Sequence, residues 1–161
     1  MNVSIASFFC AGGIVTSMPE KETLERAAED KREGKSASTQ AGEFVREEMH
    51  HIRGGKHGAK NSKQALAIGL NKARKAGVRL GTPKRGSAKT KAAAKSASRR
   101  AGKKTSAKRS RATERALKKM PKRAASHQAL SKQAKSAARK RSSASRSAAA
   151  KKAAQTRKKA A

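Results

Sequence analysis

The chain contains no Trp or Tyr, and its three aromatic residues are Phe8, Phe9 and Phe44. Leu, Ile, Val and Phe together fall below the roughly 20% that, combined with a high net charge, is typical of disordered chains. Most of the 35% hydrophobic content is Ala, which gains only about one methyl group of transfer energy on burial. Because ordering each residue costs about 1–2 kcal/mol of backbone entropy, the composition predicts a mostly disordered chain with a small all-α unit.

Cysteine and long apolar runs are also scarce. Cys10 is the only cysteine, which excludes an internal disulfide, and no apolar run reaches the roughly 18 residues of a membrane span. The apolar extension 1–18 lacks the Lys or Arg of a secretory signal, and Gly12-Gly13 interrupts its apolar core. We therefore expect translation to start at Met18 rather than a signal peptide at this end.

Acidic residues almost disappear after the first third of the chain. The first 48 residues hold 6 basic and 9 acidic side chains, whereas residues 49–161 hold 36 Lys and Arg against Glu114 alone. The whole chain carries a formal net charge of +32. A chain with this charge repels itself unless a polyanion neutralises it, so the charge distribution predicts nucleic acid as the partner.

Residues 39–80 carry the clearest helical pattern. Thr39 or Ser38 can cap a helix that runs through residues 42–53 and ends at Gly54-Gly55. Asn61 or Ser62 can cap a second helix, residues 63–76, that ends at Gly77. Two such helices joined by a short basic loop predict a helical hairpin at about 39–78. Its expected core is apolar: Phe44, Val45, Met49, Ile52, Leu66, Ile68 and Leu70.

The segments on either side of this hairpin have weaker patterns. Residues 19–38 are strongly charged and favour a short, solvated, frayed helix or linker, because Leu24 is their only large apolar side chain. Residues 81–161 form a Lys/Ala/Ser-rich tail, with 26 Lys and Arg among residues 86–161. Like charges four residues apart oppose helix formation, so we expect this tail to be disordered when free and helical on binding.

The basic residues predict a phosphate-binding surface with little sequence preference, because no aromatic side chain is available in the tail to stack on a base. Thr82-Pro83-Lys84-Arg85 also has the Ser/Thr-Pro-basic-basic pattern of linker-histone tails, although a Pro-initiated turn explains it equally well. The predicted nucleic-acid-binding residues come from the hairpin and the tail: Lys56, Lys60, Lys63, Lys72, Arg74, Lys75, Arg79, Lys84, Arg85, Arg99, Arg100, Lys103, Lys104, Lys108, Arg109, Arg139, Lys140 and Arg141.

The sequence predicts no cofactor, no metal and no catalytic site. His50 and His51 point to different sides of a helix, and we expect no Cys or nearby carboxylate to complete a tetrahedral site with His57. The segment Gly54-Gly55-Lys56-His57-Gly58 lacks the spacing of a phosphate-binding P-loop. No nucleophile and base stand at a recognisable spacing, so we expect a protein that is not an enzyme.

Residues 38–78 read STQAGEFVREEMHHIRGGKHGAKNSKQALAIGLNKARKAGV. This segment resembles a short, uncharacterised bacterial helical domain family, whose members combine a VREEMHHIRxGKHG-like and a KQALAIGLNKARKAG-like segment with Lys/Ala-rich tails. The resemblance implies a bacterial origin and an occasional association with DNA binding, and no established activity. The tail itself resembles linker-histone C-termini and the Lys/Ala-rich nucleoid proteins of bacteria in composition.

These observations together predict a histone-like, sequence-nonspecific protein of the bacterial cytoplasm that condenses DNA in the nucleoid. Affinity is then expected to depend on the 86–161 tail, and the hairpin to dock or to self-associate weakly. The first alternative is an RNA-binding or ribosome-associated basic protein, since the tail serves either polyanion. The second is a cationic protein of the membrane surface, which the absence of Trp and the weakly amphipathic tail disfavour.

Overall fold

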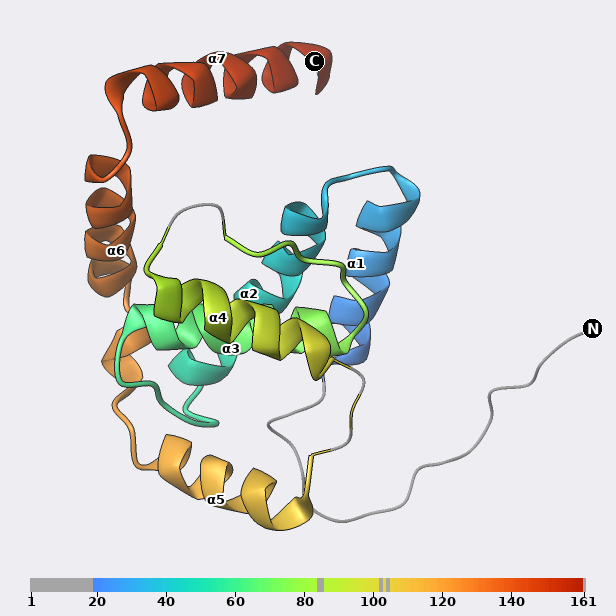
Figure 1. Ribbon diagram of the computed structural model, residues 1–161, viewed down its shortest axis with the longest axis vertical. Helices are drawn as coiled ribbons and strands as arrows, with labels where there is room; N and C mark the ends of the chain where they lie inside the picture. The colour runs from blue at the N-terminus through green and yellow to red at the C-terminus, as the bar shows by residue number, and fades with distance from the viewer. Residues whose placement is uncertain (1–18, 84–85, 102, 104, 161) are drawn as a thin grey trace, which may run out of the picture.

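The computed structural model describes residues 19–83, 86–101, 103 and 105–160 (Figure 1). Seven α-helices and one 3₁₀ helix follow one another in the described residues, and no strand occurs among them. They are α1 (Lys21–Arg32), α2 (Ala37–Arg53), α3 (Ser62–Lys75), α4 (Ala88–Arg99), α5 (Ala107–Lys118), η1 (Lys122–Ala125), α6 (His127–Arg139) and α7 (Ser143–Ala160). The predicted extension 1–18 lies outside the described residues.

The prediction of a mostly disordered chain is wrong, because the described part is all-helical and 74% of it is in helices. Serines at the start of the tail helices supply one reason. The hydroxyls of Ser87, Ser106 and Ser126 accept hydrogen bonds from the backbone N–H groups of Thr90, Arg109 and Ala129. Such a cap contributes about 1 kcal/mol, and Ala is the best helix former. Together these offset like-charge pairs that cost only about 0.2–0.5 kcal/mol each.

Helices α2 and α3 form the predicted hairpin and supply most of its core residues. Helix α2 begins earlier than expected, because Ser36 rather than Ser38 or Thr39 accepts the capping hydrogen bond from Thr39 N. Of the two predicted caps, Asn61 and Ser62, it is Asn61 that caps α3, with its Oδ1 2.9 Å from Gln64 N. Gly69 of α3 lies directly against the α2 backbone: a Cβ at this position would be 2.8 Å from Val45 Cα. The two helices therefore pack at very close range.

The predicted apolar core is largely present. Phe44, Met49 and Ile52 are buried, and Val45, Leu66 and Leu70 are half-buried against them. Ile68 is half-buried as well, but it belongs to neither of the two apolar clusters. One cluster surrounds Ile52, and the other surrounds Phe44. The Ile52 cluster includes Ala124 and Ala125, and the Phe44 cluster includes Ala27, so residues outside the hairpin complete the core.

Helix α1 packs against α2 instead of standing free in solvent. Its small side chains Thr23 and Ala27 make the contact, whereas Leu24 remains 41% exposed. Arg26 Nε donates a 2.8 Å hydrogen bond to Glu43 Oε2 of α2. The predicted short charged helix within 19–38 is present and mostly exposed, but it also packs on α2 through two small side chains.

A segment of the predicted tail closes the other end of the hairpin. Ala124 and Ala125 of η1 are buried in the Ile52 cluster, and Leu130 of α6 packs against it. Backbone hydrogen bonds run from Gly58 N to Leu117 O and from Ala59 N to Pro121 O. Residues 117–130, which we call the docking segment, are thus part of the folded core and not of a free tail.

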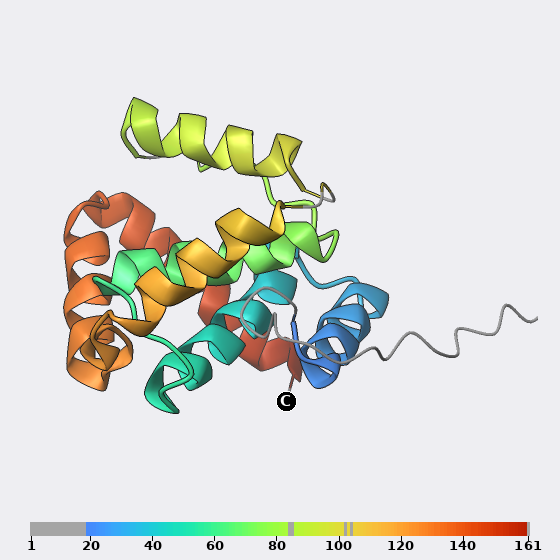
Figure 2. The ribbon, with the colours of Figure 1, turned by 90° about the horizontal axis from the view of Figure 1, so that it is seen from below.

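Outside the docking segment, the tail helices are exposed. Helices α4 and α6 contain no buried residue, and α5 buries only Leu117, at its C-terminal end. In Figure 1, α5 and α7 lie apart from α1–α3, at opposite ends of the molecule. In Figure 2, α4 lies on one side of α3 and α2 lies on the other, with α1 next to α2. The protein therefore consists of a small helical core from which basic helices extend.

Candidate nucleic-acid interface

The exposed helices α4–α7 present most of the positive charge. Within them, Glu114 of α5 is the single acidic side chain, and it pairs with Lys118 at 2.9 Å. Eight predicted binding residues lie exposed in or beside these helices: Arg99, Arg100, Lys103, Lys108, Arg109, Arg139, Lys140 and Arg141. Three others, Lys84, Arg85 and Lys104, lie outside the described residues. Phosphate contact by the eight needs no unfolding, because their side chains already face solvent.

The hairpin adds a second group of basic residues. Lys60 and Lys63 are exposed at the start of α3, and Lys75 and Arg79 are exposed around its end. Lys56 is also exposed, but its Nζ lies 2.6 Å from Glu20 Oε1 of the segment before α1. Lys56 is therefore already neutralised in part by a carboxylate and contributes less to an anion-binding surface than its neighbours.

One predicted contact does not belong to this surface, and a second is only partly exposed. Lys72 is only 3% exposed, and its ammonium pairs with Glu48 Oε2 at 2.8 Å and Glu47 Oε1 at 3.2 Å. Its assignment to the basic face is wrong, because Lys72 lies on the same side of α3 as the buried Ala65, Gly69 and Ala73. Arg74 is half-buried, and its Nη1 donates to the Leu70 carbonyl at 3.5 Å.

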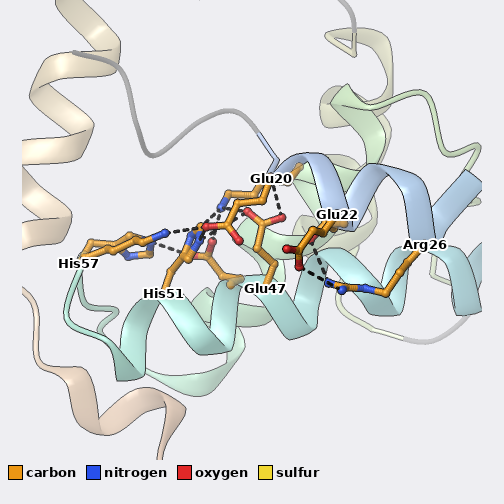
Figure 3. Close-up of polar contacts among 10 residues, drawn as sticks. Glu20, Glu22, Arg26, Glu47, His51 and His57 are labelled. Carbon is orange, nitrogen blue, oxygen red and sulfur yellow. Dashed lines mark hydrogen bonds and ion pairs between the residues drawn. The ribbon is translucent and has the colours of Figure 1, made fainter. Parts of the chain in front are cut away.

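Lys72 is the centre of a buried ionic cluster, which we define as Glu47, Glu48, His51, His57 and Lys72. Figure 3 shows His51 of α2 and His57 of the following loop approaching one another beside Glu47. Their ring centroids are 6.3 Å apart. His57 Nε2 lies 3.3 Å from Glu48 Oε1, yet neither Glu48 oxygen nor His57 Nε2 makes a hydrogen bond with another described residue. The cluster thus brings side chains of α2, α3 and the intervening loop together.

Glu20 connects this cluster to the start of α1. Its Oε1 lies 2.8 Å from His51 Nε2 and 2.6 Å from Lys56 Nζ. These hydrogen bonds, from Lys56 first and His51 second, lower the pKa of the Glu20 carboxyl to about 2. The carboxylate is half-exposed, so each pair is worth no more than about 1 kcal/mol.

The expectation that no carboxylate lies near the histidines is wrong. Glu48, His51 and His57 are all buried, and each offers a ligand atom within 4.8 Å of the others. The available signal was the i,i+3 spacing of Glu48 and His51, which places both on one helix face. Only the loop conformation, which the sequence does not specify, brings His57 to them.

Charge is distributed unevenly over the protein. Helix α1 exposes Glu22, Glu25 and Glu29, while its basic neighbours Lys21 and Arg26 pair with Glu25 and Glu22 at 3.7 and 3.6 Å. The α1 side is therefore close to neutral or acidic, and the α4–α7 helices are cationic. A polyanion is attracted to the second region and not to the first.

No protein-family model, curated protein or solved structure matches this chain. The resemblance of residues 38–78 to a bacterial helical domain family therefore stays a prediction. Within the part of the chain that the structure describes, no helix is long and apolar enough to cross a membrane.

Proposed function

We propose that the protein is a histone-like, sequence-nonspecific DNA-binding protein that acts by neutralising phosphates in the bacterial nucleoid. The observation that carries this proposal is the exposure of the basic side chains on helices α4–α7, which hold a single acidic residue among them. Each Lys or Arg that meets a phosphate releases a condensed counterion, and this release favours binding without reading any base.

The absence of stacking side chains favours duplex over single-stranded targets. The last aromatic residue in the chain is Phe44, which is buried in the core. Proteins that hold single strands or read RNA loops stack bases on exposed aromatic rings. A cationic helix needs only the phosphate groups, which a duplex presents at about one charge per 1.7 Å.

The helical structure of the basic segments also affects how they bind DNA. Helix α7 has 18 residues and is therefore ~27 Å long, which matches about 16 duplex phosphate charges. A preformed helix loses less conformational entropy on binding than a disordered tail of the same composition. We therefore place the main DNA contacts on α4–α7, with Lys60, Lys63, Lys75 and Arg79 of the hairpin as a second contact region.

The test is a comparison of affinities by fluorescence anisotropy for two unrelated DNA duplexes, a duplex RNA and anionic lipid vesicles. We expect equal affinity for the two DNA sequences and a fall of orders of magnitude between about 50 and 200 mM salt. Binding to DNA that is insensitive to salt would contradict the proposal. Tighter binding to the RNA would favour a ribosome- or RNA-associated role, and vesicle binding at physiological salt would favour a membrane role.

Deleting residues 86–161 would not separate the effect of charge on DNA binding from an effect on the fold. The docking segment lies inside that range and contributes Ala124 and Ala125 to the core, so the deletion would damage the fold together with the charge. Removing only residues 142–161 deletes α7, which lies apart from α1–α3 in Figure 1. This shorter deletion removes six basic residues and is expected to reduce both affinity and its salt dependence.

A further inference from the structure

We propose that Glu48, His51 and His57 form a binding site for one divalent transition-metal ion, with Zn²⁺ the best match to their donor atoms. One carboxylate oxygen and two imidazole nitrogens are a ligand set that Zn²⁺ commonly takes, with a fourth position left for water. Softer or harder ions fit less well, because the cluster offers no thiolate and too few oxygens for Ca²⁺.

The distance between Glu48 and His57 fits a shared ion better than a direct bond. Their facing atoms, Oε1 and Nε2, are 3.3 Å apart without forming a hydrogen bond. Two ligands of a tetrahedral ion with bonds of about 2.0–2.1 Å stand about 3.4 Å apart. All three ligand atoms lie within 4.8 Å of one another, so they must move somewhat closer together to share an ion.

The hydrogen bonds around the rings direct a lone pair of each histidine into the cluster. His57 Nδ1 lies 3.2 Å from the Gly58 carbonyl, which can only accept, so Nδ1 carries the hydrogen and leaves Nε2 facing Glu48. His51 Nδ1 lies 3.4 Å from the Lys72 ammonium, which can only donate, so its lone pair points toward Lys72 and an ion bound there takes the place of Lys72 at this nitrogen. The His51 hydrogen is then on Nε2 and is donated to Glu20 Oε1 at 2.8 Å. A carboxylate that accepts a hydrogen bond from one ring nitrogen in this way orients the other nitrogen for a metal.

Burial makes a cation between these atoms favourable. The side chains of Glu48 and His57 are 0% and 1% exposed, and two buried carboxylates, Glu47 and Glu48, face one buried ammonium, Lys72. Two buried carboxylates thus share a single ammonium, and buried charges are costly unless they are paired or coordinate a metal. Lys72 keeps Glu47 Oε1 and Glu48 Oε2 as partners, while Oε1 of Glu48 is left for the ion.

A metal here would act as a structural link and does not depend on the proposed DNA binding. Glu48 and His51 lie on α2, and His57 lies in the loop whose Gly58 and Ala59 hydrogen-bond the docking segment. An ion joining them would fix this loop and support the contact with residues 117–130. Small folds with few large apolar side chains commonly need such a staple.

The experiment uses the full chain without an affinity tag, stripped with a chelator and then dialysed against Zn²⁺ or Co²⁺. We expect one equivalent of Zn²⁺ per chain by elemental analysis, a rise in melting temperature, and the visible bands of tetrahedral Co²⁺. His57→Gln and Glu48→Gln should each weaken binding more than about tenfold, since even changes in residues behind the ligands cost 10–100-fold.

Two controls separate this site from other donors. His50→Gln changes an exposed neighbour on the same helix and should bind as the unaltered chain does, and Cys10→Ser excludes the thiol as a ligand. Absence of Zn²⁺ and Co²⁺ binding by the unaltered chain would overturn the proposal even if the ligand variants fail to fold. Unchanged Co²⁺ bands in a folded His57→Gln variant would overturn it as well, and the cluster would then be an ion-pair network only.

Discussion

The side-chain hydroxyl of Ser62, at the start of α3, donates a 2.9 Å hydrogen bond to the carbonyl oxygen of Ala124, 62 residues later in the chain. Both residues are buried. Nearby, Arg53 Nε donates to the Ala125 carbonyl at 2.9 Å. These bonds attach a segment rich in Ala and Lys to the hairpin with specific geometry. The core of this protein is therefore completed by residues that composition alone assigns to a tail.

Replacing Ser62 with Ala tests this attachment. The change removes the donor and leaves the buried Ala124 carbonyl without this partner, which costs about 1–3 kcal/mol. We expect the urea midpoint, followed by circular dichroism, to fall accordingly. Ser147→Ala is the matched control, because Ser147 is exposed on α7 and such changes stay within about 0.5 kcal/mol. Equal midpoints for the two variants would show that the docking segment adds nothing to stability.

The close contact between α2 and α3 can be tested with two glycines. A Cβ at Gly69 would lie 2.8 Å from Val45 Cα and 3.0 Å from its Cγ2, so Gly69→Ala must push the helices apart. We expect a loss of about 1–3 kcal/mol from overpacking, despite the better helix propensity of Ala. Gly42→Ala on α2 meets nothing within 4 Å and should gain up to about 1 kcal/mol. Thermal unfolding that shifts both variants in the same direction would contradict the packing described here.

The hairpin was predictable because its information is local. Apolar residues at helical spacing, glycines after the helix ends and the Asn61 cap lie within a few residues of the structure they determine. The docking segment was not predictable in this way. Ala124 and Ala125 carry no distinguishing pattern in a segment where Ala is common, and only their long-range packing on Ile52 makes them core residues.

The exposed basic residues of the candidate site were predictable from the sequence, but the buried cluster was not. Exposed basic residues on the tail helices could be named from the sequence, because almost any Lys or Arg there faces solvent. Lys72 was misassigned because charge was given more weight than position: it lies three residues after Gly69 and one before Ala73, both buried. The grouping of His57 with Glu48 depends on a loop and on tertiary contacts, so no spacing along the chain encodes it.

The two lysines Lys72 and Lys75, on the same helix, should therefore behave differently. Lys72→Gln removes the ammonium that pairs with the buried Glu47 and Glu48, and breaking a buried pair from one side costs about 3–5 kcal/mol. Lys75→Gln changes an exposed side chain and should alter stability by less than about 0.5 kcal/mol. Chemical denaturation of both variants distinguishes these outcomes. A Lys72→Gln protein as stable as Lys75→Gln would mean that the cluster is not held by this charge.

DNA binding should depend on where the charges lie and not only on their number. The triple change of Arg139, Lys140 and Arg141 to Gln removes three exposed cations between α6 and α7. Each phosphate contact contributes about 0.9 to the slope of log affinity against log salt concentration. If all three side chains meet phosphates, the slope becomes shallower by about 2–3, with a matching loss of affinity at low salt. Anisotropy titrations at several salt concentrations measure this change.

The control for that prediction changes Lys21, Lys31 and Arg32 of α1 to Gln, which removes the same formal charge from the side that carries Glu22, Glu25 and Glu29. These cations lie among carboxylates that repel DNA, so few of them can meet a phosphate and the slope should hardly change. Circular dichroism of both triple variants verifies that the helices remain. Equal slopes in the two variants would indicate a response to net charge alone, and the assignment of the DNA contacts to helices α4–α7 would then be wrong.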